Sequence, residues 1–298
     1  MSKPTIHLAF TVPLGSTLVR RAIDKAIRLA HLTPLHRSAN DGLIPWQHPI
    51  RSVHAITYNL LHHLKDLGYP VQLYSLYEHT VARLAPGDIF IGLPLPQGGM
   101  GSTRSDTDEK TSVTSRTIRE YPDNATYVIM PYSPDPTYAN WTKDLLRDAA
   151  AAGGRAIFIG GTIWERNWSE SPYADIVGLK KTHVEMGIDP LDYPVVKDSY
   201  NPKGKRKYLY IGHTDWYKNT GELERIADAI PGFEGLHIGA GIVRGWKNKT
   251  FASLTPDFMR SIAKEYDIFV NTSLGDPQAT TILEQICFGF AVVCTPET

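Results

Sequence analysis

Two acidic residues near the carboxyl end of this 298-residue sequence, Asp276 and Glu284, are candidates for contact with a ligand. Asp276-Pro277 is typical of a helix start, because aspartate can accept hydrogen bonds from the free amides of the first turn and proline has no N–H to satisfy. Glu284 follows among apolar residues, where a carboxylate is costly unless something donates hydrogen bonds to it. A ribose diol would be a suitable donor.

The elements around this helix are those of a parallel sheet. The apolar run 268–270 predicts a buried strand, Gly289 predicts the end of the helix, and 291–294 predicts the next strand. A helix that begins past the carboxyl end of a parallel strand directs free amides into the crevice where such sheets bind ligands. The pattern predicts a phosphate site here. Its candidate ligands are the amides that follow Asp276, at Gln278, Ala279 and Thr280.

This run resembles the donor-site signature of retaining glycosyltransferases built from two Rossmann-like domains, the GT-B arrangement of glycosyltransferase group 1 (family 4-like). Their pattern is an acid, seven residues and a Glu, followed by Gly-x-Pro-Val-Val. Here it reads Asp276, seven residues, Glu284 and then Gly289-Phe-Ala-Val-Val. The resemblance implies that Asp276 contacts the donor sugar and that Glu284 holds the nucleotide ribose. The departures from the family are Asp276 for Glu, Pro277-Gln278-Ala279 for Gly-Phe-Gly, and Ala291 for Pro.

A second match lies earlier in the chain, after a predicted strand at 208–212. The family has Gly-Arg, four residues and Lys-Gly at this place, and its Arg and Lys neutralise the donor diphosphate. Lys218 stands at the matching distance, while His213 replaces the Arg and adds charge only when it is protonated. The resemblance therefore implies that Lys218, His213 and Asp276 are the catalytic groups. Gly212, Gly239 and Gly15, which each follow a predicted strand, are further candidates for donor binding.

Strands alternate with helices along the whole chain, which predicts the α/β class with parallel sheets. In the first half, strands are expected at 6–12, 71–76, 88–92, 127–130 and 156–159, helices at 17–32, 50–67 and 141–152, and a long loop at 97–117. In the second half, helices are expected at 220–230 and 256–266, and strands at 235–239 and 250–252.

The resemblance also implies the domain organisation. The stretch from Met186 to Tyr193 is similar to the one that precedes the second domain in this family, and the polar segment 197–207 follows it. We therefore expect an acceptor-side domain at 1–196, a linker at 197–207 and a donor-binding domain at 208–298. The second domain is expected to be incomplete, because family members continue through further strand and helix units. The rest of a longer chain, or a partner, would complete it.

The composition bears on the classes of partner, on disulfide and metal sites, and on location. The chain has 31 basic and 31 acidic residues, which gives no reason to expect nucleic-acid binding. Its two cysteines lie in apolar segments, so neither a disulfide nor a metal site is expected. The first fifteen residues are poor material for a signal peptide, and no stretch approaches a membrane span, so a cytoplasmic location is expected. A peripheral contact with a membrane stays open.

The resulting expectation is a hexosyltransferase-like enzyme that moves a sugar, with retention, from a nucleotide-diphosphate sugar to a carbohydrate or another hydroxyl acceptor. It would need no metal and no cofactor beyond this co-substrate. Two alternatives stay open. One is a nucleotide-sugar epimerase or hydrolase of the same fold, for which His48, His79 and His183 are candidate acids or bases. The other is a non-catalytic module that binds nucleotide sugars.

Overall fold

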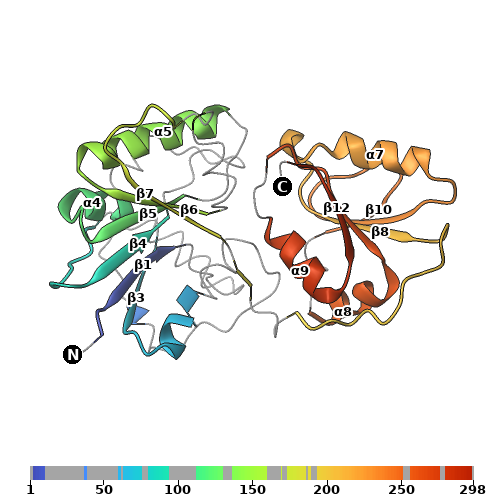
Figure 1. Ribbon diagram of the computed structural model, residues 1–298, viewed down its shortest axis with the longest axis horizontal. Coiled ribbons are helices and arrows are strands. Elements are labelled where there is room, and N and C mark those ends of the chain that lie inside the picture. The colour runs from blue at the N-terminus through green and yellow to red at the C-terminus, as the bar shows by residue number, and fades with distance from the viewer. Residues whose placement is uncertain are drawn as a thin grey trace, which may run out of the picture. The chain divides into compact units, whose positions relative to one another are not determined.

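The chain forms two separate α/β units. The computed structural model describes residues 3–10, 37–38, 60–61, 63–75, 80–93, 112–129, 136–159, 169, 173–185, 187–188, 193–250, 256–275 and 279–296. The described residues up to Val184 belong to the first unit and those from Glu185 onward to the second. Each unit has its own, mainly parallel sheet with helices packed on it (Figure 1), which confirms the predicted α/β class.

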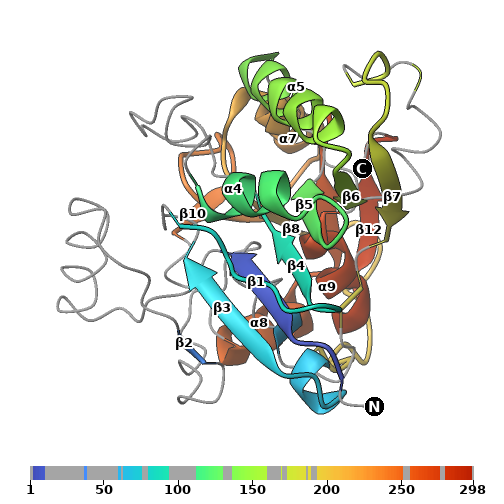
Figure 2. The ribbon, with the colours of Figure 1, turned by 90° about the vertical axis from the view of Figure 1, so that its left-hand side faces the viewer.

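The first unit is built on a seven-stranded sheet in the order β2-β3-β1-β4-β5-β6-β7. Its strands are β1 (Ile6–Phe10), β2 (Arg37–Ser38), β3 (Val71–Ser75), β4 (Ile89–Gly92), β5 (Ala125–Ile129), β6 (Arg155–Ile159) and β7 (Lys180–Val184). All neighbours pair in parallel except β2, which runs antiparallel to β3. Figure 2 shows β1 between β3 and β4. The five strands predicted for this half are confirmed.

Helix α4 (Val113–Glu120) overturns part of the loop predicted at 97–117. Ser112 caps this helix, and its buried face carries the hydroxyl groups of Thr114, Ser115 and Thr117 beside only two apolar side chains, those of Val113 and Ile118. Thr114 Oγ1 donates to a main-chain carbonyl just past β4 at 3.0 Å, and Thr117 Oγ1 accepts from the amide of Ala82 at 2.9 Å. Because most residues of the buried face are Ser or Thr, the helix shows no clear apolar periodicity in the sequence.

Two further elements of the first unit complete its sheet and its cover. Helix α5 (Pro136–Ala151) confirms the helix predicted at 141–152 and starts five residues earlier. Strand β7 was not predicted, because its sequence, Lys-Lys-Thr-His-Val, lacks an apolar run. It pairs with β6 along its whole length as an edge strand, which keeps most of its side chains exposed.

The second unit has a five-stranded, all-parallel sheet in the order β10-β9-β8-β11-β12. The strands are β8 (Lys207–Ile211), β9 (Glu234–Ile238), β10 (Lys247–Lys249), β11 (Ile268–Asn271) and β12 (Ala291–Cys294). The helices are the 3₁₀ turn η2 (Trp216–Lys218), α7 (Thr220–Ala229), α8 (Pro256–Glu265) and α9 (Thr280–Phe288).

Two boundaries in this unit differ from prediction. Helix α9 begins at Thr280 and not at Asp276-Pro277, so Asp276 is not its N-cap. Strand β10 lies at 247–249 and not at 250–252, because pairing with β9 fixes the register by setting Lys247 opposite Leu236. Asn248 adds to this fit by contacting His237 of β9, 2.7 Å from its Nδ1.

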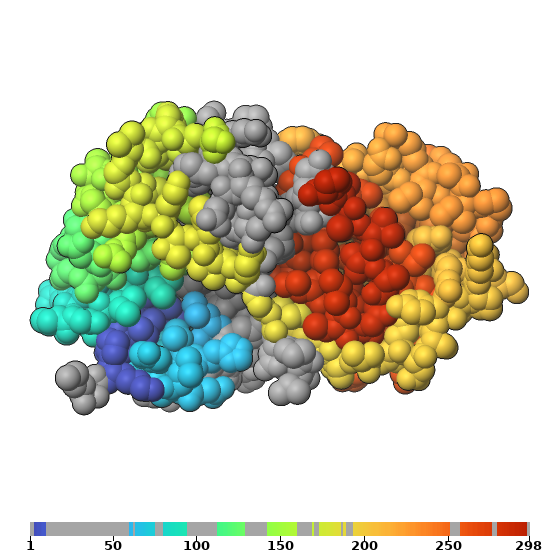
Figure 3. Space-filling view, in the orientation of Figure 1, coloured from blue at the N-terminus to red at the C-terminus, as the bar shows by residue number. Residues whose placement is uncertain are grey.

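Both faces of the second sheet are covered. On one face Leu209, Ile211 and Phe269 pack with Ile262 of α8 and Phe288 of α9. The alternate residues Tyr210 and Val270 point to the other face, where they pack with Leu223 of α7, Val243 and Trp246. Figure 1 shows α7 on one side of this sheet and α8 with α9 on the other. Residues of α9 and β12 form a continuous part of the surface of this unit (Figure 3). In the described residues, no helix is long and apolar enough to span a bilayer.

The buried carboxylate of Asp267, at the start of β11, fastens the segment 193–207 to the second sheet. Its side chain is 0% exposed and lies 3.1 Å from Nζ of Lys197, which is itself only 2% exposed. The amides of Asn201 and Lys207 and the Asn201 side chain donate to it at 2.9, 3.0 and 2.9 Å. Burial alone would raise the pKa of Asp267, but these donors and Lys197 hold it below its usual value. The segment predicted as a linker is therefore tied to the second unit along its length.

Replacing Asp267 with alanine should destabilise the protein strongly, because the Lys197 ammonium would stay buried without its charge partner. We expect a loss of about 3–5 kcal/mol in the free energy of unfolding, measured by urea denaturation followed by circular dichroism. Asp257→Ala is the matched control, because Asp257 pairs with Arg260 at an exposed position on α8 and such pairs contribute only about 0–1 kcal/mol. Equal losses in the two variants would contradict a structural role for the buried pair.

Candidate functional site

The carboxyl ends of β8 and β11 mark the point in the second sheet where strand order reverses. From β8 the chain proceeds to β9 and β10 on one side, and then returns to β11 and β12 on the other. In open parallel sheets, ligands bind in the crevice at such a switch point. The loops that leave these two strands carry Gly212, His213 and Lys218 on one side and lead to helix α9 on the other.

Main-chain hydrogen bonds join the Lys218 turn to the end of β11. Thr272 Oγ1 donates to the carbonyl of Lys218 at 3.0 Å, and the amide of Leu274 donates to the carbonyl of Tyr217 at 2.8 Å. The Lys218 Nζ lies 5.2 Å from the centre of the Tyr217 ring. Asn219 ends the turn with a φ of 50°, the one positive φ of a non-glycine residue in the described part of the chain. Asparagine adopts this left-handed conformation more readily than most residues, so it can replace the glycine of the resembled motif.

Gly212 and Gly239 are required where the β8 and β9 loops touch. A Cβ on Gly239 would lie 1.7 Å from the Gly212 carbonyl oxygen, and one on Gly212 would meet the Tyr210 hydroxyl at 2.5 Å. The buried His237 places its Nε2 3.0 Å from the same carbonyl, and the Gly212 amide donates to the carbonyl of Ile238 at 3.1 Å. These glycines therefore let the two loops pack tightly and fix the loop that precedes Lys218.

His213 follows directly on this fixed loop. The Tyr210 hydroxyl donates to the main-chain carbonyl of His213 at 2.7 Å, and the residue is half-buried. The main chain at His213 is thus held at the carboxyl end of β8, five residues before Lys218. The structure places both residues on the loop that the sequence indicates.

Helix α9 begins without a side-chain cap. Its N-cap, the buried Ala279, has no acceptor in its side chain, and Thr280 is the first helical residue. The first amides of a helix have no partner within the helix, and the positive end of the helix dipole lies there. The start of α9 is therefore suited to an anion, as the sequence predicted for Ala279 and Thr280.

Glu284 lies one turn along α9 from Thr280, and its ionised form is disfavoured. The residue as a whole is half-buried, but the groups packed around the carboxyl raise its pKa to about 7, although a hydrogen bond from Tyr193 lowers it in part. Each further hydrogen-bond donor that reaches this carboxyl group stabilises its ionised form. A pair of hydroxyl groups from a ligand would supply two.

Tyr193 is a site residue to which sequence reasoning gave no role. It comes from the segment that leads into the second sheet, and its ring packs edge-on against Phe288 with the centroids 5.6 Å apart. The amide of Val196 donates to the carbonyl of Phe288 at 3.4 Å, which holds this segment along α9. The resemblance of 186–193 to a family motif marked the segment, but only packing shows that Tyr193 reaches Glu284. His237 and Thr272, also missed, carry no motif at all.

For several predicted candidates the structure gives no position, or a position in the other unit. Asp276, Gln278, Gly15, His48 and His79 lie outside the described residues. His183 lies on β7 of the first unit, where its ring packs edge-on against Phe158 at 5.6 Å. The two cysteines, Cys287 and Cys294, are free. Within the described ranges, no three His, Cys, Asp or Glu side chains are grouped so as to hold a metal ion.

Comparison with known proteins gives structural neighbours only. No protein-family model matches the chain, and no curated protein matches it in sequence. An α,α-trehalose-phosphate synthase (UDP-forming) from Burkholderia vietnamiensis is similar in structure, with a TM-score of 0.57 and 10% identity, over 100% of this chain and 84% of that one. The apo structure of OtsA has a TM-score of 0.52 and 9% identity, over 100% and 85% of the two chains. A trehalose-6-phosphate synthase has a TM-score of 0.51 and 10% identity, over 99% and 84%. At this identity the likeness shows the fold: the chain has the fold of two-Rossmann-domain proteins.

Proposed function

We propose that the chain is a glycosyltransferase that moves a hexosyl group from a nucleotide-diphosphate sugar to a hydroxyl acceptor, with retention. One observation carries the proposal. At the switch point of the second sheet, the Lys218 turn is bonded to the end of β11, and the chain then leads to a helix start without a side-chain cap and to a carboxyl group with a raised pKa. A cation, free amides and a carboxylate are the groups that bind a diphosphate and a ribose.

In this proposal the diphosphate lies between Lys218 and the first turn of α9. The ammonium supplies a compact charge, and the amides near Ala279 and Thr280 supply directed donors. The ribose diol donates to Glu284, which Tyr193 already orients with one hydrogen bond. Gly212 and Gly239 let the loops after β8 and β9 pack tightly, which fixes the loop that carries His213 and Lys218 beside the ligand. Asp276 and Gln278, between β11 and α9 in sequence, are proposed to contact the sugar.

The chemistry fits these groups. Departure of the nucleoside diphosphate increases the negative charge on its phosphate oxygens. Lys218, on its fixed turn, and the first amides of α9 are proposed to stabilise this charge with little reorganisation. His213 can donate a further hydrogen bond and adds positive charge when protonated. The leaving phosphate is proposed to take the acceptor's proton on the same face of the sugar, so no protein base is required.

The two units of the fold suggest a separate role for each, one on the donor side and one on the acceptor side. One structural neighbour is a trehalose-phosphate synthase described as UDP-forming, so UDP is the first nucleotide to test. We propose that the first unit, which ends at Val184, provides the acceptor side and that the second unit, from Glu185 onward, provides the donor side. The acceptor is proposed to be a carbohydrate or another hydroxyl compound.

Calorimetric titration with UDP, and then with GDP and ADP, tests the donor site directly. We expect saturable binding of one of them, and Lys218→Gln should weaken it by about tenfold or more, since charged hydrogen bonds contribute ~1.5–3 kcal/mol. The same variant should bind the free nucleoside as the wild type does, because Lys218 faces only the phosphates. Lys203→Gln, at an exposed turn of the same unit, is the matched control and should change neither affinity. If a folded protein binds none of the nucleotides, the donor-site proposal fails.

The raised pKa of Glu284 makes a second prediction, about pH. A diol prefers the ionised carboxylate, so the nucleotide should bind more tightly to the wild type as the pH rises from 6 to 8, through the pKa of about 7. In Glu284→Gln this gain should be absent. The ligand's own titration is common to both proteins, so the difference between their pH profiles isolates Glu284. Parallel profiles would exclude Glu284 from the ribose site.

The same group predicts how stability depends on pH. The folded protein keeps Glu284 protonated up to a pH of about 7, whereas the unfolded chain loses the proton near its ordinary value of 4.5. Between these values the folded state binds more protons, so Glu284 lowers the free energy of unfolding as the pH rises. Glu284→Gln should therefore unfold at a higher urea concentration than the wild type at pH 8, and the gap should close near pH 4. A gap that is independent of pH would contradict the burial argument.

A further inference from the structure

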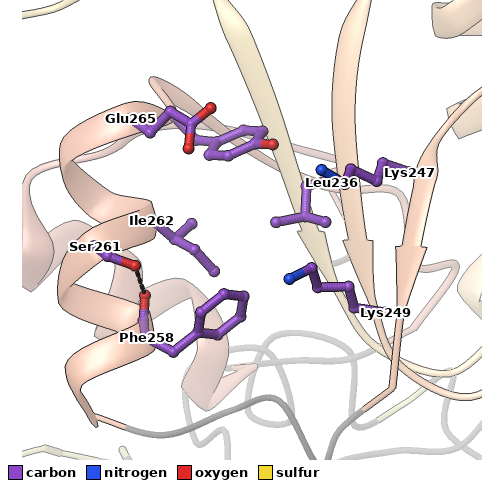
Figure 4. Close-up of a pocket in the computed structure, with 8 residues that line it drawn as sticks. Leu236, Lys247, Lys249, Phe258, Ser261, Ile262 and Glu265 are labelled. Carbon is purple, nitrogen blue, oxygen red and sulfur yellow. Dashed lines mark hydrogen bonds between the residues drawn. The ribbon is translucent and has the colours of Figure 1, made fainter.

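A second concave site lies under helix α8, at the edge of the second sheet, away from the switch point between β8 and β11. It is a pocket of about 100 Å³ between α8 and strands β9 and β10 (Figure 4). The lining side chains are Leu236, Lys247, Lys249, Phe258, Ser261, Ile262, Glu265 and Tyr266. The mechanism proposed above uses none of them.

Strand alternation directs two lysines to this pocket. Lys247 and Lys249 are two residues apart on β10, so their side chains leave the same face of the sheet from Cα atoms about 6.6 Å apart. Asn248, between them, faces the other way and hydrogen-bonds to His237 and the Val243 main chain. Figure 4 shows the Lys249 ammonium directed into the pocket toward Phe258, and its Nζ lies 4.6 Å from the centre of that ring.

Among the described residues, the charged groups around the pocket leave the ammonium groups of these two lysines available to bind an anion. Glu265, the one carboxylate in the lining, already pairs with Lys207 Nζ at 2.9 Å, and Glu234 pairs with the same ammonium at 3.0 Å. Asp257, next to Phe258 on α8, pairs with Arg260 at 2.7 Å. In the part of the chain that the structure describes, no carboxylate is paired with Lys247 or Lys249. An anion between the two ammonium groups would be attracted by both.

Part of the lining of the pocket is apolar. Figure 4 shows Leu236 on the strand side of the pocket and Ile262 and Phe258 on the side of α8. Tyr266 also lines the pocket. An apolar group here would lose water-exposed area, while a head group lay between the lysines. We propose that this pocket binds a small organic anion, a phosphate monoester or a carboxylate joined to an apolar body, at a site separate from the donor site.

Titration with phenyl phosphate and with benzoate tests the proposal. Calorimetry gives the affinity, and methyl NMR signals of Leu236 and Ile262 give the location. We expect one of the two probes to bind and to shift both signals, and to bind more tightly than inorganic phosphate, which lacks the ring. The tighter of the two probes identifies the head group. If neither probe shifts these signals, the proposal is wrong.

The double variant Lys247→Gln with Lys249→Gln should weaken the binding of that probe by about tenfold or more, since two charged contacts are lost. Both lysines lie on an edge strand, so the variant should stay folded. Lys203→Gln with Lys205→Gln removes the same charge from an exposed turn and should leave binding unchanged. Phe258→Leu should weaken binding of the probe but not of inorganic phosphate.

Two outcomes would overturn the proposal. Edge lysines can also serve only to prevent strands of other molecules from pairing with the sheet. In that case the double variant would self-associate more readily and bind the probe as before. Alternatively, Lys218→Gln would abolish probe binding while the lysine pair made no difference, which would place the anion in the donor site. Nucleotide binding is measured separately. A negative result for the α8 pocket therefore does not bear on the donor-site proposal.

Discussion

The second unit depends on one buried ion pair. Asp267 and Lys197 are withdrawn from water, and a charge buried in this way is tolerable only when every donor and acceptor around it is satisfied. Here Asp267 receives two amides and a carboxamide, and Lys197 also donates to the carbonyl of Tyr266 at 2.8 Å. The pair joins the segment before β8 to the junction of α8 and β11. Losing either partner would release that segment.

The consequences of this pair extend along α9. Once Lys197 is fixed, the residues before it lie along the helix, with Val196 bonded to Phe288 and Tyr193 within reach of Glu284. Gly289, at the end of α9, has a φ of 94°, which favours glycine, and a Cβ there would lie 3.2 Å from the Cβ of Lys197. A structural ion pair at the amino ends of the strands thereby helps to position a carboxyl group that belongs to the candidate site. The candidate site and the stability of the unit therefore both depend on the segment 193–197.

At the opposite ends of the strands, close packing replaces charge as the organising constraint. The main chain after β8 touches the main chain after β9 at Gly212 and Gly239, and no other residue type would fit. Just past this contact, the Tyr210 hydroxyl donates to the His213 carbonyl, and Thr272 donates to the turn that follows. Hydrogen bonds to the main chain thus fix the turn that carries Lys218, and its Nζ lies 5.2 Å from the centre of the Tyr217 ring.

Much of this arrangement was predictable from sequence, because apolar runs in parallel strands and glycines at helix ends leave clear local patterns. Strand β12 and the end of α9 at Gly289 follow from such patterns, and so does the place of Lys218 after β8. Other elements left no such pattern. Helix α4 buries hydroxyl groups whose partners are distant in sequence, and β7 is a polar edge strand that is held by β6 alone.

The sequence by itself determined the α/β class and the order in which the candidate groups occur. Only the tertiary structure decided which of them are held at one edge of the sheet, and in what electrostatic state. The raised pKa of Glu284 illustrates why: it depends on burial and on Tyr193, which is 91 residues away in the chain. Local sequence specifies backbone preferences, whereas desolvation and long-range hydrogen bonds arise only when distant segments pack together.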